Sequence, residues 1–479
     1  MAEIYAIAQV PPEISAYGMA RYSRSHASLR ESLLALSQEK AERFLNTFYF
    51  AYGHASIADL AHIALAIENI SLLAAMDVVN EPLWDGQERS TRYQTFAQHA
   101  YYTPSEAGSD YHHQIAALYS LYQELAQVAN QALTERFPPP PSMKDEAYQR
   151  TIRARALDVA RYALPLATLT SLGQITNARV LERQIARLLT SPWPEVQDIG
   201  RGMKRAVTEA KPFNLAAAQA VQQGAPAMVD DDAPVAPTLI KHADADGYRL
   251  RLSRRVAAIV AEFFPGETLA SPTVEIWPLR DAVEDLVAGI VYEHAHLSYG
   301  EILQRLRSLG PRLQQEILDE ILALRGAHDP WPDVMRQRPL IVDTVIDVGA
   351  FRDINRHRRL DKIVQPLEPR MGFAVPPEML EMGVGQRFEQ VLDAHYRSLA
   401  QQPPLVQGYL LPLAHRRRAL LRMDWPEAAY LIELRSRSSG HFSYRRWAND
   451  LYRALAATWP TLVRHIRVTP FEAFDPFER

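Results

Sequence analysis

The sequence predicts an α+β protein built from two tandem, diverged copies of one domain, helix-rich with a small sheet in each copy. Three observations lead to this prediction. Long stretches rich in Ala and Leu are typical of helices, short β-branched runs lie between them, and several landmarks recur in the same order in both halves. A chain of 479 residues is long enough to form two or three separate cores.

Helices are expected to dominate each copy. Residues 151–172, rich in Ala, Leu and Arg, are typical of a helix that Pro165 interrupts, because a residue before proline disfavours helical backbone. Residues 340–346 form a β-branched run that predicts a strand. Asp347 follows this run and is expected to cap a short helix that ends near Arg358.

The clearest landmark is a Leu-Pro-Leu-Ala segment, which occurs around Pro165 and again around Pro412. In each half a polar residue suited to capping a helix, Asn177 or Asp424, follows twelve residues after the proline. Glu427 completes a capping-box pattern with Asp424. Recurrence of these landmarks in one order predicts a duplication.

The composition of the central segment places the domain boundary. Residues 224–238 are rich in Pro, Ala and Asp without apolar periodicity, so they are interpreted as a linker between domains at 1–223 and 239–479. The proline run at 138–141 is expected to form a stiff loop inside the first half.

The bulk composition excludes several kinds of site. The chain has no cysteine, which excludes disulfides, zinc thiolates, iron–sulfur clusters and a cysteine nucleophile. A net charge of −4 gives no overall positive field, so neither nucleic acid nor a membrane surface is expected as a partner. His112 and His113 lack further ligands at metal spacing, so no metal site is predicted. The absence of a signal-peptide pattern predicts a cytoplasmic protein.

Two polar clusters suit phosphate groups. Arg356, His357 and Arg358 are consecutive, and guanidinium groups match phosphate oxygens bidentately; the alternative is a solvated basic surface. Ser90 and Arg92 place a hydroxyl beside a cation in the polar loop 87–93, and the alternative is a loop held by its own side-chain bonds to the backbone.

Three further features leave alternatives open. Arg435 ends the helix that Asp424 begins, and it could bind a carboxylate or phosphate or could cap helix carbonyls. His54 could contact a ligand or could be structural. Residues 440–446 interleave basic and aromatic side chains as RNA-binding surfaces do, although the acidic overall charge disfavours that function.

Together these clusters resemble the flavin-dependent thymidylate synthase family. That family has a Gly-His-x-Ser/Thr segment, an R-H-R-x-x-S-x-N-x-x-S-x-R-Y motif, a Leu-Pro segment, an Asn-x-Arg helix start and a nucleotide-binding Arg. The resemblance covers roughly residues 40–210 and 320–465. The matching segments are Gly53-His54-Ala55-Ser56, Ser90-Thr91-Arg92-Tyr93, Leu164-Pro165-Leu166 and Asn177-Ala178-Arg179 in the first half, and Arg356-His357-Arg358, Leu411-Pro412-Leu413 and Leu434-Arg435 in the second.

Neither half carries the long motif whole. In the first half, Asn80-Glu81-Pro82 stands at the R-H-R position and Leu188 stands at the position of the nucleotide-binding Arg. In the second half, the Ser-x-Arg-Tyr part is missing after Arg359. The first half therefore keeps the Ser-x-Arg-Tyr part, and the second half keeps the Arg-His-Arg triplet and the nucleotide-binding Arg.

The resemblance implies FAD as cofactor and methylation of dUMP, or a related pyrimidine nucleotide, with methylenetetrahydrofolate and NADPH. The family needs no enzyme cysteine and works as a homotetramer with sites between subunits, so a fused pair predicts a homodimer with hybrid sites between its domains. The alternative is an inactive homologue that binds flavin or nucleotide or acts as a structural partner. The implied residues are Arg356, His357, Arg358, His54, Asn177 and Arg179 for the cofactor and Ser90, Arg92 and Arg435 for the substrate.

Overall fold

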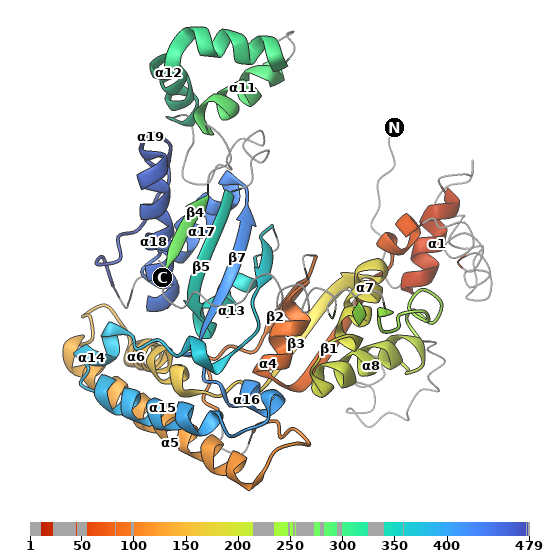
Figure 1. The fold of residues 1–479 in the computed structure, drawn as a ribbon, viewed down its shortest axis with the longest axis vertical. Helices are drawn as coiled ribbons and strands as arrows, with labels where there is room; N and C mark the ends of the chain where they lie inside the picture. Colours follow the sequence, from red (N-terminus) through yellow and green to blue (C-terminus); the bar gives the residue numbers. More distant parts are fainter. Residues whose placement is uncertain are drawn as a thin grey trace. The chain divides into compact units, whose positions relative to one another are not determined.

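The computed structural model of the chain (Figure 1) describes most of its length in two compact units. The first unit takes residues 1–89 and 170–266, and the second takes residues 90–169 and 267–479. The residues described are 11–22, 45, 55–81, 83–96, 100–213, 234–247, 250, 251, 254, 273–277, 282–294, 299–323, 340–357, 359–475 and 477. Most of the expected linker 224–238 lies outside them, and the domain boundary there stays a prediction.

The first unit contains a three-stranded sheet in the order β1-β3-β2. Helices follow two of its strands, and each begins at a polar cap: Ser71 accepts a hydrogen bond from Ala74 N, and Asn177 accepts one from Val180 N. Its elements are α1 (Pro12–Tyr22), η2 (Ala55–Leu60), β1 (His62–Ser71), α4 (Leu72–Val79), β2 (Asp85–Glu88), β3 (Leu169–Asn177), α7 (Ala178–Leu189) and α8 (Pro194–Thr208).

The second unit contains a four-stranded antiparallel sheet in the order β4-β5-β7-β6. Asp347 caps the helix after β5 by accepting from Ala350 N, and Asp424 caps the helix after β7 by accepting from Glu427 N. The elements of this sheet and its following helices are β4 (Val274–Trp277), β5 (Leu340–Asp347), α13 (Val348–Asn355), β6 (Asp361–Val364), β7 (Arg416–Met423), α17 (Trp425–Arg435), α18 (Phe442–Thr458) and α19 (Pro460–Val463).

Further helices of the second unit come from both halves of the sequence. The long helices of residues 109–160 and the helices of residues 377–410 lie together below the sheet in Figure 1. These elements are α5 (Ser109–Arg136), α6 (Asp145–Ala160), η3 (Arg161–Ala163), α11 (Ala282–His294), α12 (Tyr299–Ala323), η5 (Pro369–Met371), α14 (Pro377–Glu381), α15 (Gly385–Leu399) and α16 (Pro404–Leu410).

The two Leu-Pro landmarks meet inside the second unit. Pro165 and Pro412 form an antiparallel bridge. Leu166 N donates to Leu411 O at 2.8 Å, and Leu413 N donates to Leu164 O at 2.9 Å. Each segment therefore donates a backbone hydrogen bond to the other and accepts one from it. Such reciprocal contacts are typical of a local two-fold axis.

The expected α+β class is confirmed, because the chain is helix-rich with small antiparallel sheets, and the two tandem copies stay a prediction. The strand expected at 340–346 and the caps at Asn177 and Asp424 are also confirmed. The helix expected at 151–172 is wrong beyond Ala160: residues 161–163 form a 3₁₀ turn and Leu169 begins β3, along which buried residues alternate with more exposed ones. In the loop expected at 87–93, residues 87 and 88 belong to β2.

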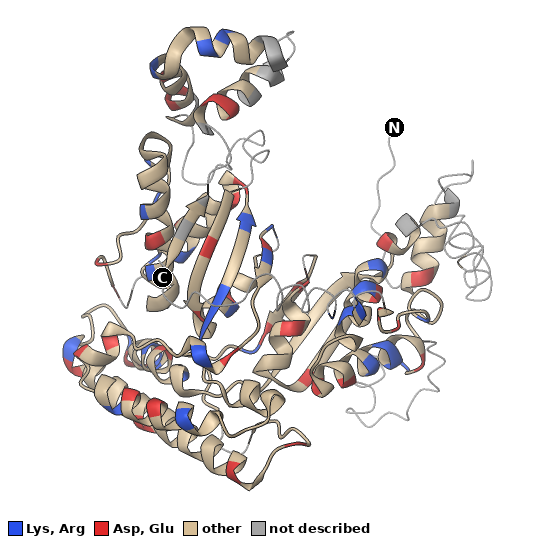
Figure 2. Cartoon of the chain, in the orientation of Figure 1, with Lys and Arg blue, Asp and Glu red and all other residues tan. Residues whose placement is uncertain are grey.

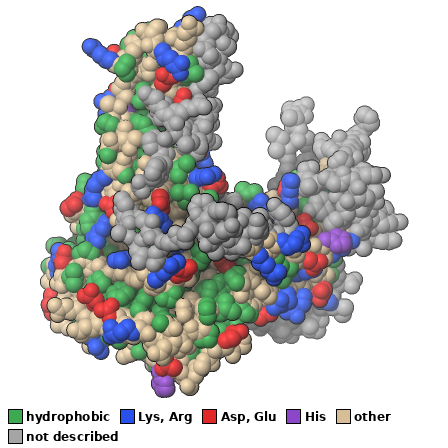
Figure 3. Space-filling view, in the orientation of Figure 1, with side chains coloured by type: hydrophobic (Ala, Val, Ile, Leu, Met, Phe, Trp, Pro, Cys, Tyr) green, Lys and Arg blue, Asp and Glu red, His purple; other side chains and the backbone are tan. Residues whose placement is uncertain are grey.

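No helix among the described residues has both the length and the apolarity to cross a membrane. Basic residues recur along β7 (Figure 2). On the face of the second unit shown in Figure 3, acidic and basic side chains are interspersed. Such a surface provides no broad positive area for a polyanion.

Candidate functional site

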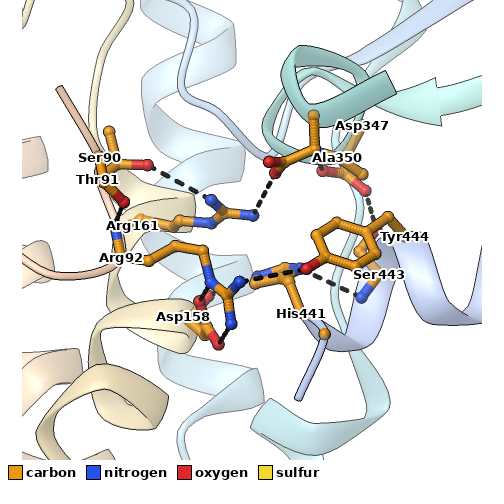
Figure 4. Close-up of polar contacts among 12 residues, drawn as sticks. Ser90, Thr91, Arg92, Asp158, Arg161, Asp347, Ala350, His441, Ser443 and Tyr444 are labelled. Carbon is orange, nitrogen blue, oxygen red and sulfur yellow. Dashed lines mark hydrogen bonds and ion pairs between the residues drawn. The ribbon is translucent and has the colours of Figure 1, made fainter. Parts of the chain in front are cut away.

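Five arginines of the second unit form a cluster, called here the arginine cluster, around two buried carboxylates (Figure 4 shows part of it). They come from separate elements in both halves of the sequence: the turn after β2, α6, the 3₁₀ turn η3, the end of α13 and the end of α17. The members are Arg92, Arg155, Arg161, Arg356 and Arg435.

Asp158 orients Arg92. The Ser90 hydroxyl accepts a hydrogen bond from Arg92 N at 3.2 Å and so shapes the turn. Arg92 Nε and Nη2 donate to the two oxygens of Asp158 at 2.6 and 2.9 Å, a bidentate arrangement. Arg92 Nη1 donates to the hydroxyl of Tyr444 at 3.1 Å, and Arg435 lies over the ring of the same tyrosine at 5.2 Å.

Asp353 connects the arginines of the two halves. Its carboxylate accepts from Arg356 Nη2 at 2.7 Å and lies 3.7 Å from Arg161 Nη2, and its backbone oxygen accepts from Arg435 Nη2 at 2.8 Å. Burial alone would raise the pKa of this carboxyl, but the charges of Arg161, Arg356 and Arg435 together hold the pKa well below its ordinary value. Asp353 is therefore ionised and balances part of the positive charge.

Arg161 carries donors without acceptors. It is 2% exposed, and Nη1 donates to the hydroxyl of Thr91 at 3.3 Å. Nε and Nη2 have no hydrogen-bond partner among the residues that the structure describes. A buried donor left unpaired costs about 1–3 kcal/mol, more when it is charged, so such a group usually marks the place of an acceptor that is not part of the protein.

His357 is held in one tautomer. Its Nε2 accepts from Arg435 Nε at 3.1 Å and from Arg435 Nη2 at 2.9 Å, so Nδ1 carries the proton and donates to Glu427 at 3.2 Å. Burial lowers the pKa of His357 and the charge of Arg435 lowers it further, although Glu427 acts in the opposite direction. The ring is neutral at pH 7. The carboxylate of Glu427 accepts the hydrogen bond from this ring. The capping-box pattern had instead predicted that Glu427 bonds to the backbone at the start of α17.

The start of α18 is packed tightly beside the cluster. His441 is fully buried and stacks on Tyr162, with ring centroids 5.6 Å apart and planes 10° apart. Burial and the charge of Arg161 lower the pKa of His441 to about 3. Ser443 binds the carboxylate of Asp347, the same residue that caps α13. These contacts fix the N-terminal ends of α13 and α18 to each other.

Of the residues predicted from sequence, five lie in the second unit, within the arginine cluster or beside it: Ser90, Arg92, Arg356, His357 and Arg435. Asn177 and Arg179 lie in the first unit, where Asn177 caps α7 and Arg179 donates to Asp59 at 2.8 Å on the surface. His54 and Arg358 lie outside the described residues. Leu188, at the position of the nucleotide-binding Arg in the first half, is fully buried core.

Sequence reasoning missed Arg161, Asp158 and Asp353. A signal was present, because Asp158 and Arg161 are charged residues inside an Ala- and Leu-rich stretch, just before Pro165. The basic-aromatic stretch 440–446 offers little surface for RNA: His441 is 0% exposed and Arg445 is 1% exposed. Within the described ranges, no group of three His, Asp or Glu side chains could hold a metal ion.

Residues 7–213 match the family model described as thymidylate synthase complementing protein. Over these residues the chain resembles this family. The match ends before Arg356. The two cluster arginines from the second half of the sequence, Arg356 and Arg435, therefore lie beyond the residues that the thymidylate synthase complementing protein model covers.

Relatives of similar length are also found. A UPF0159 protein of Chlamydia muridarum is 25% identical over 98% of this chain and 93% of its own, and UPF0159 protein Ta1429 of Thermoplasma acidophilum is 24% identical over 94% of each chain.

Two solved structures resemble part of the chain. The flavin-dependent thymidylate synthase ThyX of Helicobacter pylori, complexed with FAD and dUMP, is 15% identical over 41% of this chain and 89% of its own, with a TM-score of 0.28. The UMP/dUMP methylase PolB of Streptomyces cacaoi, bound with 5-Br dUMP, is 16% identical over 40% and 84%, also with a TM-score of 0.28.

Proposed function

We propose that this protein is a flavin-dependent enzyme that methylates dUMP, or a related pyrimidine nucleotide, with methylenetetrahydrofolate and NADPH. The observation that carries the proposal is Arg161, a buried guanidinium with two donors that have no hydrogen-bond partner among the described residues. It lies among arginines contributed by both halves of the chain. The match of residues 7–213 to the thymidylate synthase complementing protein model supports the kind of reaction.

The charge of the cluster supports a phosphorylated substrate. Five guanidinium groups surround two ionised carboxylates, Asp158 and Asp353, which leaves an excess of roughly three positive charges. A phosphate monoester carries about −1.5 to −2 charges near pH 7 and offers three acceptor oxygens. Arg161, Arg435 and the Ser90 hydroxyl would hold these oxygens, so the site would be a hybrid of the two halves.

Arg356 and His357 would hold the flavin cofactor. The Arg356 side chain is 33% exposed and uses one donor on Asp353, so it can also reach a diphosphate. His357 is neutral, and both of its ring nitrogens are bonded to protein, to Arg435 and Glu427, which suits a ring contact with the flavin rather than proton transfer. FAD would supply the redox chemistry, and the chain's own residues would bind the phosphates, orient the two ligands and exclude water.

We also propose that the chain is a tandem duplication. Strand order β1-β3-β2 in the first unit matches β5-β7-β6 in the second. Capped helices follow β1 and β3 in the first unit, and β5 and β7 in the second. The reciprocal contacts around Pro165 and Pro412 support the same view. Two such chains would provide four domains, so a homodimer is the proposed assembly.

A specific observation favours the alternative of an inactive homologue. All three guanidinium nitrogens of Arg92 already donate to Asp158, Tyr444 or Ser439, and Arg435 is already bound to His357. Two of the five arginines therefore have hydrogen-bond acceptors within the protein and need no ligand. Such a protein would still bind nucleotide or flavin, or would act as a structural partner, without turnover.

The test begins with the purified full chain. We expect the visible absorption bands of flavin, a change in them when dUMP is added, and bleaching by NADPH. Arg161→Gln should weaken dUMP binding at least about tenfold, since it removes charge-assisted hydrogen bonds. Arg453→Gln, which alters an exposed pair with Asp450 in the same unit, is the matched control and should leave binding unchanged.

Complementation of a thymidine auxotroph tests turnover, with Arg356→Ala and Ser90→Ala as variants from the two halves. Loss with both variants would support the hybrid site. Flavin that binds but is never reduced would favour the inactive homologue. A chain that binds neither flavin nor dUMP would refute the proposed enzyme and leave the structural partner as the alternative.

A further inference from the structure

The second unit contains a cavity of about 390 Å³ beside the arginine cluster, and Arg155 and Asp158 of that cluster are among its lining residues. Five segments line it: the end of α5, α6, α14, the start of α18 and residues 471–474 near the C-terminus. We propose that this cavity binds a small molecule with an aromatic body and a planar cationic group of the amidinium type. Its volume lies in the range of small-molecule sites in proteins.

The walls favour an aromatic body. Phe137 and Phe474 meet edge to face with ring centroids 6.0 Å apart, and Arg155 lies over the second ring at 5.3 Å. Offset and edge contacts between rings are favourable beyond the area that they bury, so a further planar ring can join this group. The apolar lining side chains are Leu133, Phe137, Val159, Met382, Phe442, Phe471 and Phe474.

The buried cations of the cavity are already engaged. Arg155 donates to the backbone oxygens of Ser439 and Gly440 at 3.2 and 3.0 Å. Arg445 donates from Nε to Ser436 O and from Nη2 to Phe471 O, both at 3.1 Å. These arginines fix the loop before α18 and the C-terminal segment, which makes them a poor receptor for an anion.

One buried carboxylate oxygen, in contrast, has no hydrogen-bond donor among the described residues. Glu378 Oε1 accepts from Arg446 at 3.0 Å, while the buried Oε2 accepts no hydrogen bond from any other side chain or backbone amide in the described part of the chain. Burial raises the pKa of Glu378, its own amide and Arg446 act against this, and Glu381 raises the pKa further. A buried acceptor without a donor is costly, so a ligand that brings an N–H is favoured.

Four carboxylates, of Asp158, Glu378, Glu381 and Glu472, line the cavity against three guanidinium groups, so the net charge of the lining favours a cation. Glu381 and Glu472 also line the cavity, and Glu381 is paired with the exposed Arg136 at 2.9 Å. Negative groups around aromatic walls attract a planar cation through both hydrogen bonds and the faces of the rings. The amidinium group fits because it presents two parallel N–H donors to a carboxylate.

Benzamidinium chloride is the probe, added to the full-length protein and followed by isothermal titration calorimetry. We expect saturable binding at one site. Glu378→Gln keeps the shape of the side chain but removes its charge, and it should weaken binding about tenfold or more. Glu389→Gln is the matched control, because Glu389 is exposed on α15 and does not line the cavity.

A second variant tests the location. Met382→Trp places a larger side chain in the cavity and should abolish binding, whatever the effect of Glu378→Gln on folding. Benzoate has the same ring with the opposite charge and should bind at least tenfold more weakly. Absence of benzamidinium binding, equal binding by benzoate, or unchanged binding in both variants would overturn the proposal. None of these readouts depends on flavin or dUMP, so this test and that of the proposed function fail separately.

Discussion

Replacing Asp353 by asparagine tests whether the arginine cluster is held together by one buried charge. The change keeps the size of the side chain and removes the negative charge that faces Arg161 and Arg356. Asp353 is 7% exposed, so water does little to compensate the two guanidinium groups that remain.

The size of the effect follows from the geometry. A pair of unit charges about 4 Å apart interacts by roughly 4 kcal/mol at an effective dielectric constant near 20. Removing one partner of a buried pair costs about 3–5 kcal/mol, because the other charge is left buried without compensation. We expect Asp353→Asn to lower the free energy of unfolding by about that amount at pH 7.

Urea denaturation in phosphate-free buffer provides the measurement. The control Glu316→Gln breaks an exposed pair with Arg312 in the same unit, and it should cost less than about 1 kcal/mol. Inorganic phosphate should stabilise Asp353→Asn more than the parent, because the variant cluster has one more uncompensated positive charge. A hundredfold excess over the dissociation constant adds about 2.7 kcal/mol.

The pH dependence gives an independent check. The folded protein lowers the pKa of Asp353 below the ordinary value of 3.8, so this residue stabilises the fold above that value and the contribution is lost as the pH falls below it. The variant should lack this part of the acid-induced loss. If Asp353→Asn is within about 0.5 kcal/mol of the parent, and phosphate acts equally on both, the reasoning about the cluster is wrong.

Three other substitutions test local features. Between pH 6.5 and 5 the parent should lose about 1.6 kcal/mol through His441, since the folded pKa is about 3 and only the unfolded chain takes up the proton. His441→Gln should remove this loss; thermal melts at both pH values measure it, and equal pH dependence would contradict it. Ser71→Ala removes the cap of α4 and a donor to buried Glu195, so urea titration should show a loss of about 1–2 kcal/mol, and a neutral result would count against the cap. Gly440→Ala would place a Cβ 2.7 Å from the Tyr444 ring, so both stability and phosphate affinity should fall, and unchanged phosphate titrations would show that this tyrosine does not support the site.

Features that depend on a few neighbouring residues were predictable from the sequence. Asn177 and Asp424 cap helices because their short side chains reach the backbone amides three residues ahead, a geometry that needs no other part of the chain. The strand at 340–346 follows from its β-branched side chains for the same reason.

Features that depend on distant partners were not predictable in this way. From the sequence, Arg435 could have bound phosphate or capped a helix. Its hydrogen bonds to His357 and Asp353 form only because α13 and α17 pack together. Residues 441–446 alternate basic and aromatic types like an RNA-binding surface, yet Arg445 is buried against backbone oxygens of the C-terminal segment.

The amino-acid sequence alone predicts the family resemblance, the helix-rich α+β character and the kinds of side chain available for a phosphate. Only the tertiary structure decided that residues 90–169 join the second unit, and so bring Arg92 and Arg161 to Asp353. The physical reason is that caps and strands are set by local backbone geometry, whereas a buried charge cluster is set by which carboxylates and guanidinium groups the folded core forces together.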